Sequence, residues 1–186
     1  MNSRVIFFGF GSIAQQHIKI LKSINPNFRF HVIRMKSNCI TKDIKITFHK
    51  NIKDIKKINQ IKLGFVCSPF NFHFKHSLEL IKNKINIFVE KPFLQSANEL
   101  KHLLSQSKKK KIFIQTGFLL RQNPAMKKIK KIIKNNKYGK IINVESNFTS
   151  FLPNWRTFDY TKSVSAQKKY GGGVINELVH EIDYLN

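Results

Sequence analysis

The sequence has little of several features that mark large classes of protein. Its 186 residues include only two cysteines, Cys39 and Cys67, and these form no CxxC pair. Neither a disulfide framework nor a cysteine-rich metal site is therefore expected. No apolar run approaches the roughly 20 residues that a membrane-spanning helix needs, and the N-terminus lacks the pattern of a signal peptide. These absences favour a cytoplasmic protein with reduced thiols, no bound metal and no membrane partner.

Acidic residues are also scarce, numbering 10 against 34 lysines and arginines, so that the formal net charge is +24. Such an excess can indicate a nucleic-acid partner. The lysines are nevertheless spread along the chain. The two densest runs are residues 108–111 and 127–137, and in the second Met126, Ile129, Ile132 and Ile133 recur at helical spacing. We interpret this run as an amphipathic helix with a solvated lysine face, and nucleic-acid binding is the less favoured hypothesis.

What the sequence does contain is an alternation of short apolar strands and helices. We expect strands at Val5–Phe8, Arg29–Arg34, Leu63–Val66, Asn86–Glu90 and Ile112–Thr116. We expect helices at Ser12–Leu21 with Ser12 as the cap, at Ile52–Ile58, at Phe72–Lys82, and at Ser96–Ser107 with Ser96 and Glu99 as a capping box. This alternation predicts right-handed crossovers and a doubly wound parallel sheet, an α/β Rossmann fold, over residues 1–117.

Residues 118–186 predict the beginning of a second domain. The basic helix is followed by a longer strand, Ile141–Phe151, and the sequence closes with a helix opened by Gly171, Gly172 and Gly173. One strand and one closing helix are too little to complete a sheet, and they would leave an unpaired edge and an exposed apolar face. We therefore expect this second domain to be incomplete.

A glycine-rich turn joins the first strand to the first helix. Glycine at position 9 allows the tight turn, and glycine at position 11 lets a pyrophosphate approach the amides of the helix N-terminus. Ala14 takes the third position, where a small residue lets helix and strand pack closely. The turn predicts a dinucleotide site, with a tight turn that binds no ligand as the alternative. The cofactor-binding candidates here are Gly9, Gly11, Ser12, Ile13 and Ala14.

The end of the second strand lacks the acidic residue that commonly binds the ribose 2′-hydroxyl of NAD. The segment reads Ile33-Arg34-Met35-Lys36-Ser37, and the nearest acid is Asp43. Arg34, helped by Lys36 or Ser37, would attract the 2′-phosphate that an acidic side chain repels. We therefore expect a preference for NADP over NAD, and the alternative is that Arg34 is a plain surface residue.

Further motifs follow the later strands at Cys67–His73, Phe88–Phe93 and Gly117–Pro124, and another opens the last helix at Gly171–Asp183. In their order and spacing, these motifs and the glycine turn resemble the Gfo/Idh/MocA family of NAD(P)-dependent sugar oxidoreductases. The resemblance runs from Val5 to the last residue. It implies an N-terminal Rossmann domain and an α+β substrate domain with an open-faced sheet that also carries the oligomer contacts. The closing segment is most similar to members that act in nucleotide-sugar or nonulosonic-acid pathways.

The resemblance also implies roles for individual residues. Lys91, beside a Lys91–Pro92 bond expected to be cis, would be the catalytic lysine that handles a substrate hydroxyl. His180 would be the second acid/base group, held by Glu177 or Asn176 in place of the family's usual aspartate. Implied cofactor contacts come from Ser68, Pro69, His73, Glu90 and Lys91, and implied substrate contacts come from Arg121, Trp155, Asn176 and Asp183.

The favoured hypothesis is thus an enzyme that transfers hydride between a nicotinamide cofactor and a sugar, nucleotide-sugar or cyclitol-like carbinol. Family members are much longer than this chain, which implies that residues 118–186 form only the start of the substrate domain. A homo-oligomer is expected of full-length members but does not follow for this chain. The alternative is a dinucleotide-binding remnant without catalytic activity.

Overall fold

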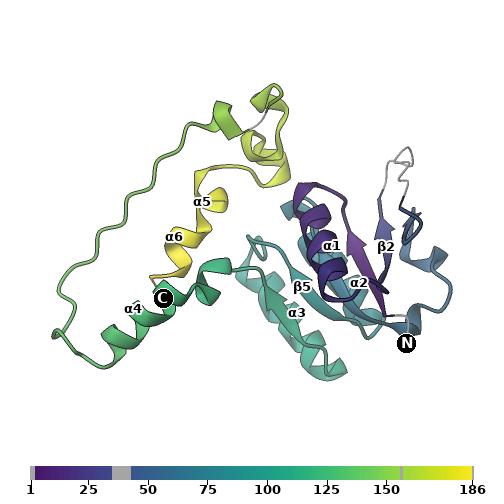
Figure 1. The fold of residues 1–186 in the computed structure, drawn as a ribbon, viewed down its shortest axis with the longest axis horizontal. Coiled ribbons are helices and arrows are strands. Elements are labelled where there is room, and N and C mark those ends of the chain that lie inside the picture. The colour runs from purple at the N-terminus through teal and green to yellow at the C-terminus, as the bar shows by residue number, and fades with distance from the viewer. Residues whose placement is uncertain (1–2, 35–42, 156, 186) are drawn as a thin grey trace. The chain divides into compact units, whose positions relative to one another are not determined.

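The computed structural model describes residues 3–34, 43–155 and 157–185 (Figure 1). The chain divides into two compact units, Met1–Thr116 and Gly117–Asn186. The boundary lies one residue before the one expected from the sequence. Each unit is described by itself below.

The first unit contains a six-stranded parallel sheet with the strand order β3-β2-β1-β4-β5-β6. The strands are β1 (Arg4–Phe8), β2 (Arg29–Ile33), β3 (Ile46–His49), β4 (Ile61–Val66), β5 (Asn86–Val89) and β6 (Ile114–Thr116). The order reverses direction between β1 and β4, which is the switch point where doubly wound sheets bind their ligands. The predicted Rossmann fold is therefore confirmed.

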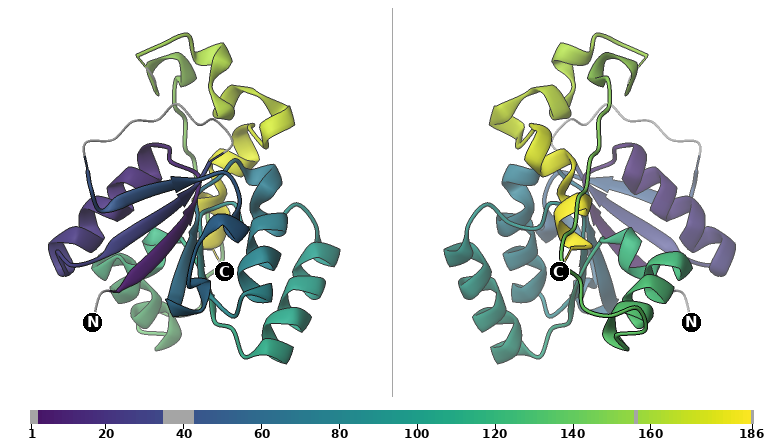
Figure 2. Two further views of the ribbon diagram at one scale, coloured as in Figure 1. Left: turned by 90° about the vertical axis from the view of Figure 1, so that its right-hand side faces the viewer. Right: turned by 90° about the vertical axis from the view of Figure 1, so that its left-hand side faces the viewer.

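Helices cover both faces of this sheet, as Figure 2 shows. Helix α1 (Ser12–Ile24) lies on one face, and α2 (His73–Lys82) and α3 (Ala97–Lys110) lie on the other. The central strand β1 is buried on both sides, because Val5 and Phe7 belong to the core under α1 whereas Ile6 and Phe8 belong to the opposite core. This alternation explains why β1 is an uninterrupted apolar run.

Three expectations for the first unit are wrong. The helix expected at Ile52–Ile58 consists of two 3-10 turns, Ile52–Asp54 and Ile58–Gln60, because Lys57 adopts a left-handed φ of 60° that interrupts any helix. Strand β3 was not expected, although Ile46 and Phe48 alternate as the strand pattern requires and pack against the α1 core. Ser12 is the first residue of α1, and its cap is Gly11, which makes no side-chain hydrogen bond.

The cap expected for α3 is present in a modified form. The Ser96 hydroxyl accepts a hydrogen bond from the Glu99 amide at 3.2 Å. The Glu99 carboxylate, however, accepts from the amide of Gln95 at 2.9 Å, one residue before the cap. The two side chains therefore still satisfy backbone amides at the helix N-terminus.

The second unit contains the basic helix α4 (Pro124–Lys134) and two short helices, α5 (Val174–Glu177) and α6 (Val179–Asp183). The closing helix expected after Gly171–Gly173 is thus divided at Leu178. Five 3-10 turns fall at Leu119–Gln122, Leu152–Trp155, Tyr160–Lys162, Val164–Ala166 and Lys168–Tyr170. Neither unit, over its described residues, has a helix both long and apolar enough to cross a membrane.

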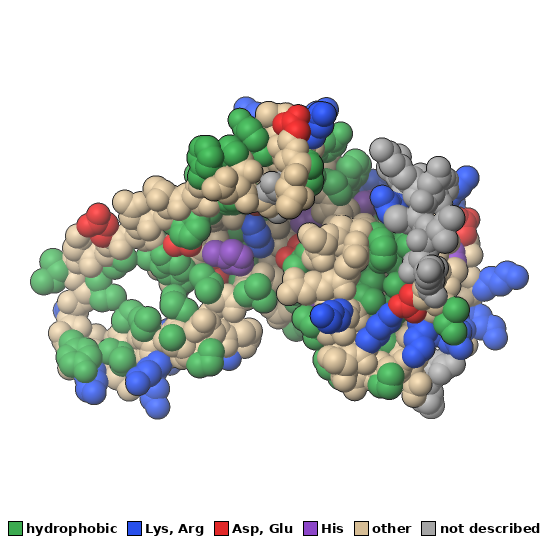
Figure 3. Space-filling model, turned by 45° about the horizontal axis from the view of Figure 1, so that its top comes forward, with side chains coloured by type: hydrophobic (Ala, Val, Ile, Leu, Met, Phe, Trp, Pro, Cys, Tyr) green, Lys and Arg blue, Asp and Glu red, His purple; other side chains and the backbone are tan. Residues whose placement is uncertain are grey.

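The strand expected at Ile141–Phe151 is wrong. Residues 141–150 have no regular secondary structure, and their trace runs as a long extended segment (Figure 1). Strands are stable only when another strand satisfies their backbone groups, and the described part of this unit contains none. Hydrophobic side chains consequently lie at the surface of the unit (Figure 3), with Ile142 99% exposed and Phe151 68% exposed.

Candidate functional site

Gly9 follows β1 and is required by the fold at the switch point. Its φ of +95° lies in the left-handed region, and an added Cβ would lie 2.6 Å from the carbonyl oxygen of Cys67. Its amide donates to the carbonyl oxygen of Ile33 at 3.1 Å. Gly9 therefore touches the carboxyl ends of both β2 and β4, and a side chain there would strain the backbone and collide with β4.

Gly11 is not required by the fold in the same way. Its φ is −77°, which any residue adopts, and an added Cβ would meet no atom within 4 Å. The position is exposed and lies at the N-terminus of α1, where the first amides have no acceptor within the helix. Open space beside free amide donors and the positive end of a helix dipole fits a phosphate group.

The next predicted residues occupy their expected places on α1. Ser12 is exposed, Ile13 is half-buried, and Ala14 is completely buried at 0% exposure. Ala14 belongs to the core formed with Phe7 and Phe65, so its small side chain brings the helix close to the sheet. The turn, its amides and the close packing together fit the pyrophosphate of a dinucleotide.

The loop after β4 is organised by two histidines. The ring of His73 is 2% exposed, and its Nε2 lies 2.9 Å from the carbonyl oxygen of Ser68. His76, one turn later, lies with its Nδ1 2.8 Å from the Ser68 hydroxyl and stacks on the Phe8 ring at 4.4 Å. Burial lowers the pKa of His76 to about 4, aided by the charges of Lys75 and His73, so this ring is neutral near pH 7.

His73, a predicted cofactor contact, is thus buried in the loop that it supports. Its second ring nitrogen, Nδ1, lies 2.9 Å from the carbonyl oxygen of Pro92. Both neighbours only accept hydrogen bonds, which favours the protonated ring, yet burial is the larger influence and lowers the pKa of His73. The ring therefore joins the loops after β4 and β5.

The loop after β5 carries Glu90, Lys91 and Pro92. The Lys91–Pro92 peptide bond is cis, as expected from the resemblance. The Glu90 amide donates to the carbonyl oxygen of Val66 at 3.0 Å, which continues the pairing of β5 with β4 by one residue. The Glu90 carboxylate accepts from His17 Nε2 at 2.6 Å. Lys91 is half-buried at the same edge of the sheet as the glycine turn.

His17, Cys67 and Glu90 together form a cluster whose ligand atoms lie within 4.8 Å of one another. Such a set could in principle hold a metal ion. Metals bind the cysteine thiolate, however, and burial together with the nearby Glu90 carboxylate raises the pKa of the Cys67 thiol. We interpret the cluster as a hydrogen-bonded histidine–carboxylate pair packed beside a neutral thiol.

Arg34 directly follows β2. Its amide donates to the carbonyl oxygen of His49 at 3.0 Å, which continues the pairing of β2 with β3. The end of β2 is where the ribose of a dinucleotide is expected. The helping residues proposed from the sequence, Lys36 and Ser37, lie outside the described residues.

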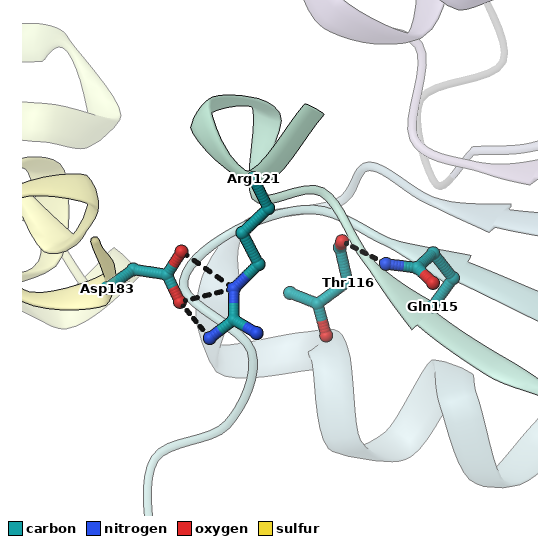
Figure 4. Close-up of polar contacts among 4 residues, drawn as sticks. All are labelled: Gln115, Thr116, Arg121 and Asp183. Carbon is teal, nitrogen blue, oxygen red and sulfur yellow. Dashed lines mark hydrogen bonds and ion pairs between the residues drawn. The ribbon is translucent and has the colours of Figure 1, made fainter. Parts of the chain in front are cut away.

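In the second unit, Arg121 and Asp183 form a bidentate ion pair (Figure 4). Arg121 Nε lies 2.9 Å from Asp183 Oδ2, and Arg121 Nη2 lies 2.7 Å from Asp183 Oδ1. The Asp183 side chain is 6% exposed and the Arg121 side chain 57% exposed. The bond to the carboxylate raises the pKa of Arg121. Two predicted substrate residues are therefore brought together, although they are far apart in the sequence.

The other predicted residues of this unit are arranged differently. The ring of Phe118 contacts both Arg121 and His180, with centroid distances of 5.6 Å to the guanidinium carbon and 6.0 Å to the imidazole. The Asn176 amide donates to the carbonyl oxygen of Gly171 at 3.0 Å, and Trp155 Nε1 donates to the Ser150 hydroxyl at 2.6 Å. Glu177 ends α5, whereas His180 lies in α6.

Residues 3–118 match the family described as "Oxidoreductase family, NAD-binding Rossmann fold" (GFO_IDH_MocA). The chain belongs to this family. It is 28% identical over 181 residues to the uncharacterized oxidoreductase YrbE of Bacillus subtilis, an alignment that covers 94% of this chain and 50% of the relative. It is 25% identical over 141 residues to myo-inositol 2-dehydrogenase of Thermotoga maritima, covering 74% and 42% of the two chains.

Among solved structures, the probable oxidoreductase YhhX matches with a TM-score of 0.72 and 23% sequence identity, over 98% of this chain and 53% of that one. This likeness supports the fold. The chain spans about half the length of the curated relatives it matches. The resemblance inferred from the order of the motifs is therefore confirmed as family membership.

Two residues that organise this family member's candidate site were missed from the sequence. His17 and His76 lie outside the residues that the sequence motifs indicate as site candidates. Each has a signal in hindsight, since a histidine on the buried face of a helix needs a polar partner. For His17 that partner is Glu90, and for His76 it is Ser68.

Proposed function

We propose that this chain provides the dinucleotide site and the catalytic lysine of an enzyme that transfers hydride between nicotinamide and a carbinol carbon. The observation that carries the proposal is the open space at Gly11, beside the α1 amides, at the sheet edge where Lys91 follows β5. Family membership supports a nicotinamide cofactor. Similarity to a myo-inositol 2-dehydrogenase supports a cyclitol-like substrate, and the proposal also includes sugar and nucleotide-sugar carbinols.

The residues of the first unit would divide the work of binding. The amides at the start of α1 donate to the pyrophosphate, and Gly9 and Gly11 allow its close approach. Ser68, Pro69 and Glu90 border the same sheet edge at the ends of β4 and β5. When bound, the nicotinamide ring supplies or accepts the hydride.

Proton handling would belong to Lys91 and His180. The Lys91 ammonium donates to the substrate hydroxyl oxygen and stabilises the negative charge that develops as its proton leaves. The imidazole of His180 would take or return that proton as the second acid/base group. Arg121, Asp183, Trp155 and Asn176 would complete the substrate site, with Glu177 orienting His180.

The same proposal includes a preference for NADP over NAD. Arg34 lies at the end of β2, where a 2′-phosphate would be held, and a guanidinium binds phosphate through parallel hydrogen bonds. In the sequence, no acidic residue lies between the end of β2 and Asp43.

The test is a titration of the purified chain with NADH and NADPH, followed by nicotinamide fluorescence, and then an assay with cyclitols, sugars and nucleotide sugars. We expect saturable binding, tighter for NADPH, and turnover that Lys91→Ala abolishes while Lys62→Ala, an exposed lysine on β4, leaves it intact. A folded chain that binds neither nucleotide would contradict the proposal.

The second candidate function is dinucleotide binding without catalysis. It is favoured by the second unit, whose described residues form no strand and leave Ile142 99% exposed. Saturable NADPH binding without turnover on any of the substrates would support it. Binding to any polyanion that weakens steeply with salt, without preference for nicotinamide nucleotides, would instead indicate a nucleic-acid binder.

A further inference from the structure

Lys91 lies between two residues that are each held by a histidine. His17 Nε2 donates to the carboxylate of Glu90, which precedes Lys91, at 2.6 Å. His73 Nδ1 lies 2.9 Å from the carbonyl oxygen of Pro92, which follows Lys91. His17 belongs to α1 and His73 begins α2, and these helices lie on opposite faces of the sheet (Figure 2).

We propose that His17 and His73 are positioning residues that fix the backbone on both sides of Lys91. The inference rests on the proposed role of Lys91 in the reaction and adds the device that holds it. Neither histidine is placed in contact with substrate. Each acts through a neighbour of the lysine.

The surroundings of His17 show why its ring can hold a carboxylate in place. The ring packs against Phe65 and Phe88 with centroid distances of 5.2 Å to each. The side chains of His17 and Glu90 are only 17% and 16% exposed. Aromatic neighbours on β4 and β5 therefore confine the ring whose Nε2 contacts the Glu90 carboxylate.

The position of His17 also links Lys91 to the glycine turn. His17 lies in α1, the helix whose N-terminal amides flank the open space at Gly11. A single rigid helix therefore sets both the phosphate-binding amides and the side chain that holds Glu90. Changes at His17 should consequently affect nucleotide binding as well as the mobility of Lys91.

On the other side of Lys91, the contact made by His73 is more deeply buried than that made by His17. The ring is 2% exposed and lies between the carbonyl oxygens of Ser68 and Pro92, each at 2.9 Å. The neutral ring donates through one nitrogen, and an apolar ring in this place would remove that donor from a part-buried carbonyl group. The imidazole thereby couples the loop after β4 to the loop after β5.

The test compares His17→Leu, His17→Gln, Glu90→Gln and His73→Leu with the unaltered chain. Hydrogen–deuterium exchange would report on the backbone amides of residues 90–95, and trace acetylation with peptide mass spectrometry would report on the Lys91 amine. We expect exchange about tenfold faster in that segment for His17→Leu and His73→Leu than for the unaltered chain. Acetylation of Lys91 should also be faster in these variants, whereas acetylation of the exposed Lys62 should be unchanged. His17→Gln, which keeps a donor for the carboxylate, should restore slow exchange.

His102→Gln is the matched control, because His102 is an exposed histidine of the same unit, on α3, whose ring packs edge-on against Phe74. It should leave residues 90–95 and Lys91 unchanged. If His73→Leu fails to fold, the comparison of His17→Leu with His17→Gln and Glu90→Gln still decides the case for the first histidine. For His73 the corresponding variant is His73→Gln, whose side-chain amide keeps an N–H donor for the carbonyl oxygens and should keep exchange slow.

Exchange and acetylation that are unchanged at residues 90–95 in folded variants would overturn the inference, as would faster exchange spread evenly over the sheet. Both measurements are independent of cofactor and substrate. Failure of the unaltered chain to bind NADPH would therefore contradict the proposed function alone. Normal NADPH binding with unchanged Lys91 exchange would contradict the positioning role alone.

Discussion

His31 Nδ1 lies 3.0 Å from His49 Nε2, across the neighbouring strands β2 and β3. Burial, the neighbouring His49 and the charge of Arg4 lower the pKa of His31 to about 4. Burial also lowers the pKa of His49, of His73 and, to about 4, of His76. The folded first unit therefore holds a set of histidines that resist protonation.

This set predicts that the protein loses stability in mild acid. The unfolded chain takes up protons near the ordinary histidine pKa of 6.5, whereas His31 and His76 in the folded chain take them up only near 4. As the pH falls through this window, the unfolded state gains protons that the folded state does not, and the free energy of unfolding decreases. Urea unfolding followed from neutral pH to pH 4 would measure the decrease.

The variant His31→Asn isolates one member of the set. We expect its free energy of unfolding to fall less across the same window, by about 1 kcal/mol, because the half-buried ring is partly screened by water. The exposed His102→Gln should follow the unaltered chain. Equal pH dependence for His31→Asn and the unaltered chain would show that His31 does not contribute.

The two glycines of the turn should separate folding from binding. Gly9→Ala places a Cβ 2.6 Å from the Cys67 carbonyl oxygen at a φ of +95°, and we expect it to lower the free energy of unfolding by about 2–4 kcal/mol. Gly11→Ala meets no atom within 4 Å and should change stability by less than about 0.5 kcal/mol.

The Gly11 substitution, which leaves stability nearly unchanged, should have a clear effect on nucleotide affinity. A methyl group at position 11 occupies the space proposed for the pyrophosphate, so Gly11→Ala should weaken NADPH binding by about tenfold or more. Fluorescence titration of this stable variant would measure the change directly. Unaltered affinity would place the pyrophosphate elsewhere.

Arg34 should determine the choice between the two nucleotides. We expect Arg34→Ala to weaken NADPH binding by about tenfold while leaving NADH affinity within about twofold, since only the 2′-phosphate is lost as a partner. Arg29→Ala is the matched control, because Arg29 is an exposed arginine at the opposite end of β2. An affinity ratio that stays the same in Arg34→Ala would assign this arginine to the surface.

The ion pair of the second unit should support local structure. Asp183→Asn leaves the guanidinium of Arg121 with a neutral partner and should lower stability by about 1–2 kcal/mol, a value reduced by the exposure of Arg121. The single tryptophan, Trp155, lies in the same unit, so its fluorescence reports unfolding there. Asp159→Asn, at an exposed pair with Lys162, should have no measurable effect. A similar loss in both variants would argue against a special role for Asp183.

Local patterns in the sequence were sufficient for most of the first unit. The apolar run of β1 and the cap of α3 are determined by neighbouring residues, so the strands, helices and glycine turn could be predicted. The segment Ile52–Gln60 could not, because the left-handed conformation of Lys57 depends on its tertiary surroundings. Strand β3 was missed because its short alternation lies beside a lysine-rich stretch that weakens the pattern.

The candidate site shows the same limit in another form. Gly9, Ala14 and Glu90 were found because they belong to motifs in sequence. The pair of His17 with Glu90 joins residues 73 positions apart, and the pair of Arg121 with Asp183 joins residues 62 positions apart. Such contacts are created by the fold. The sequence therefore indicated most of these residues but not which of them would contact one another. The strand expected at Ile141–Phe151 does not form, because a strand pattern in the sequence does not provide the neighbouring strand with which it must pair.

The place of β1 at the centre of the sheet has a consequence for synthesis on the ribosome. Its two neighbours are β2 and β4, and the second of these ends at Val66, whereas β5 and β6 follow at the edge. The apolar segment Val5–Phe8 therefore gains strand partners on both edges only after residue 66 has left the ribosome, and α2 (His73–Lys82) covers its second face later still. Nascent chains stalled at successive lengths should become protease-resistant in two stages, first when β4 is free and again when β6 has joined. During that interval the segment is a natural client for a ribosome-associated chaperone.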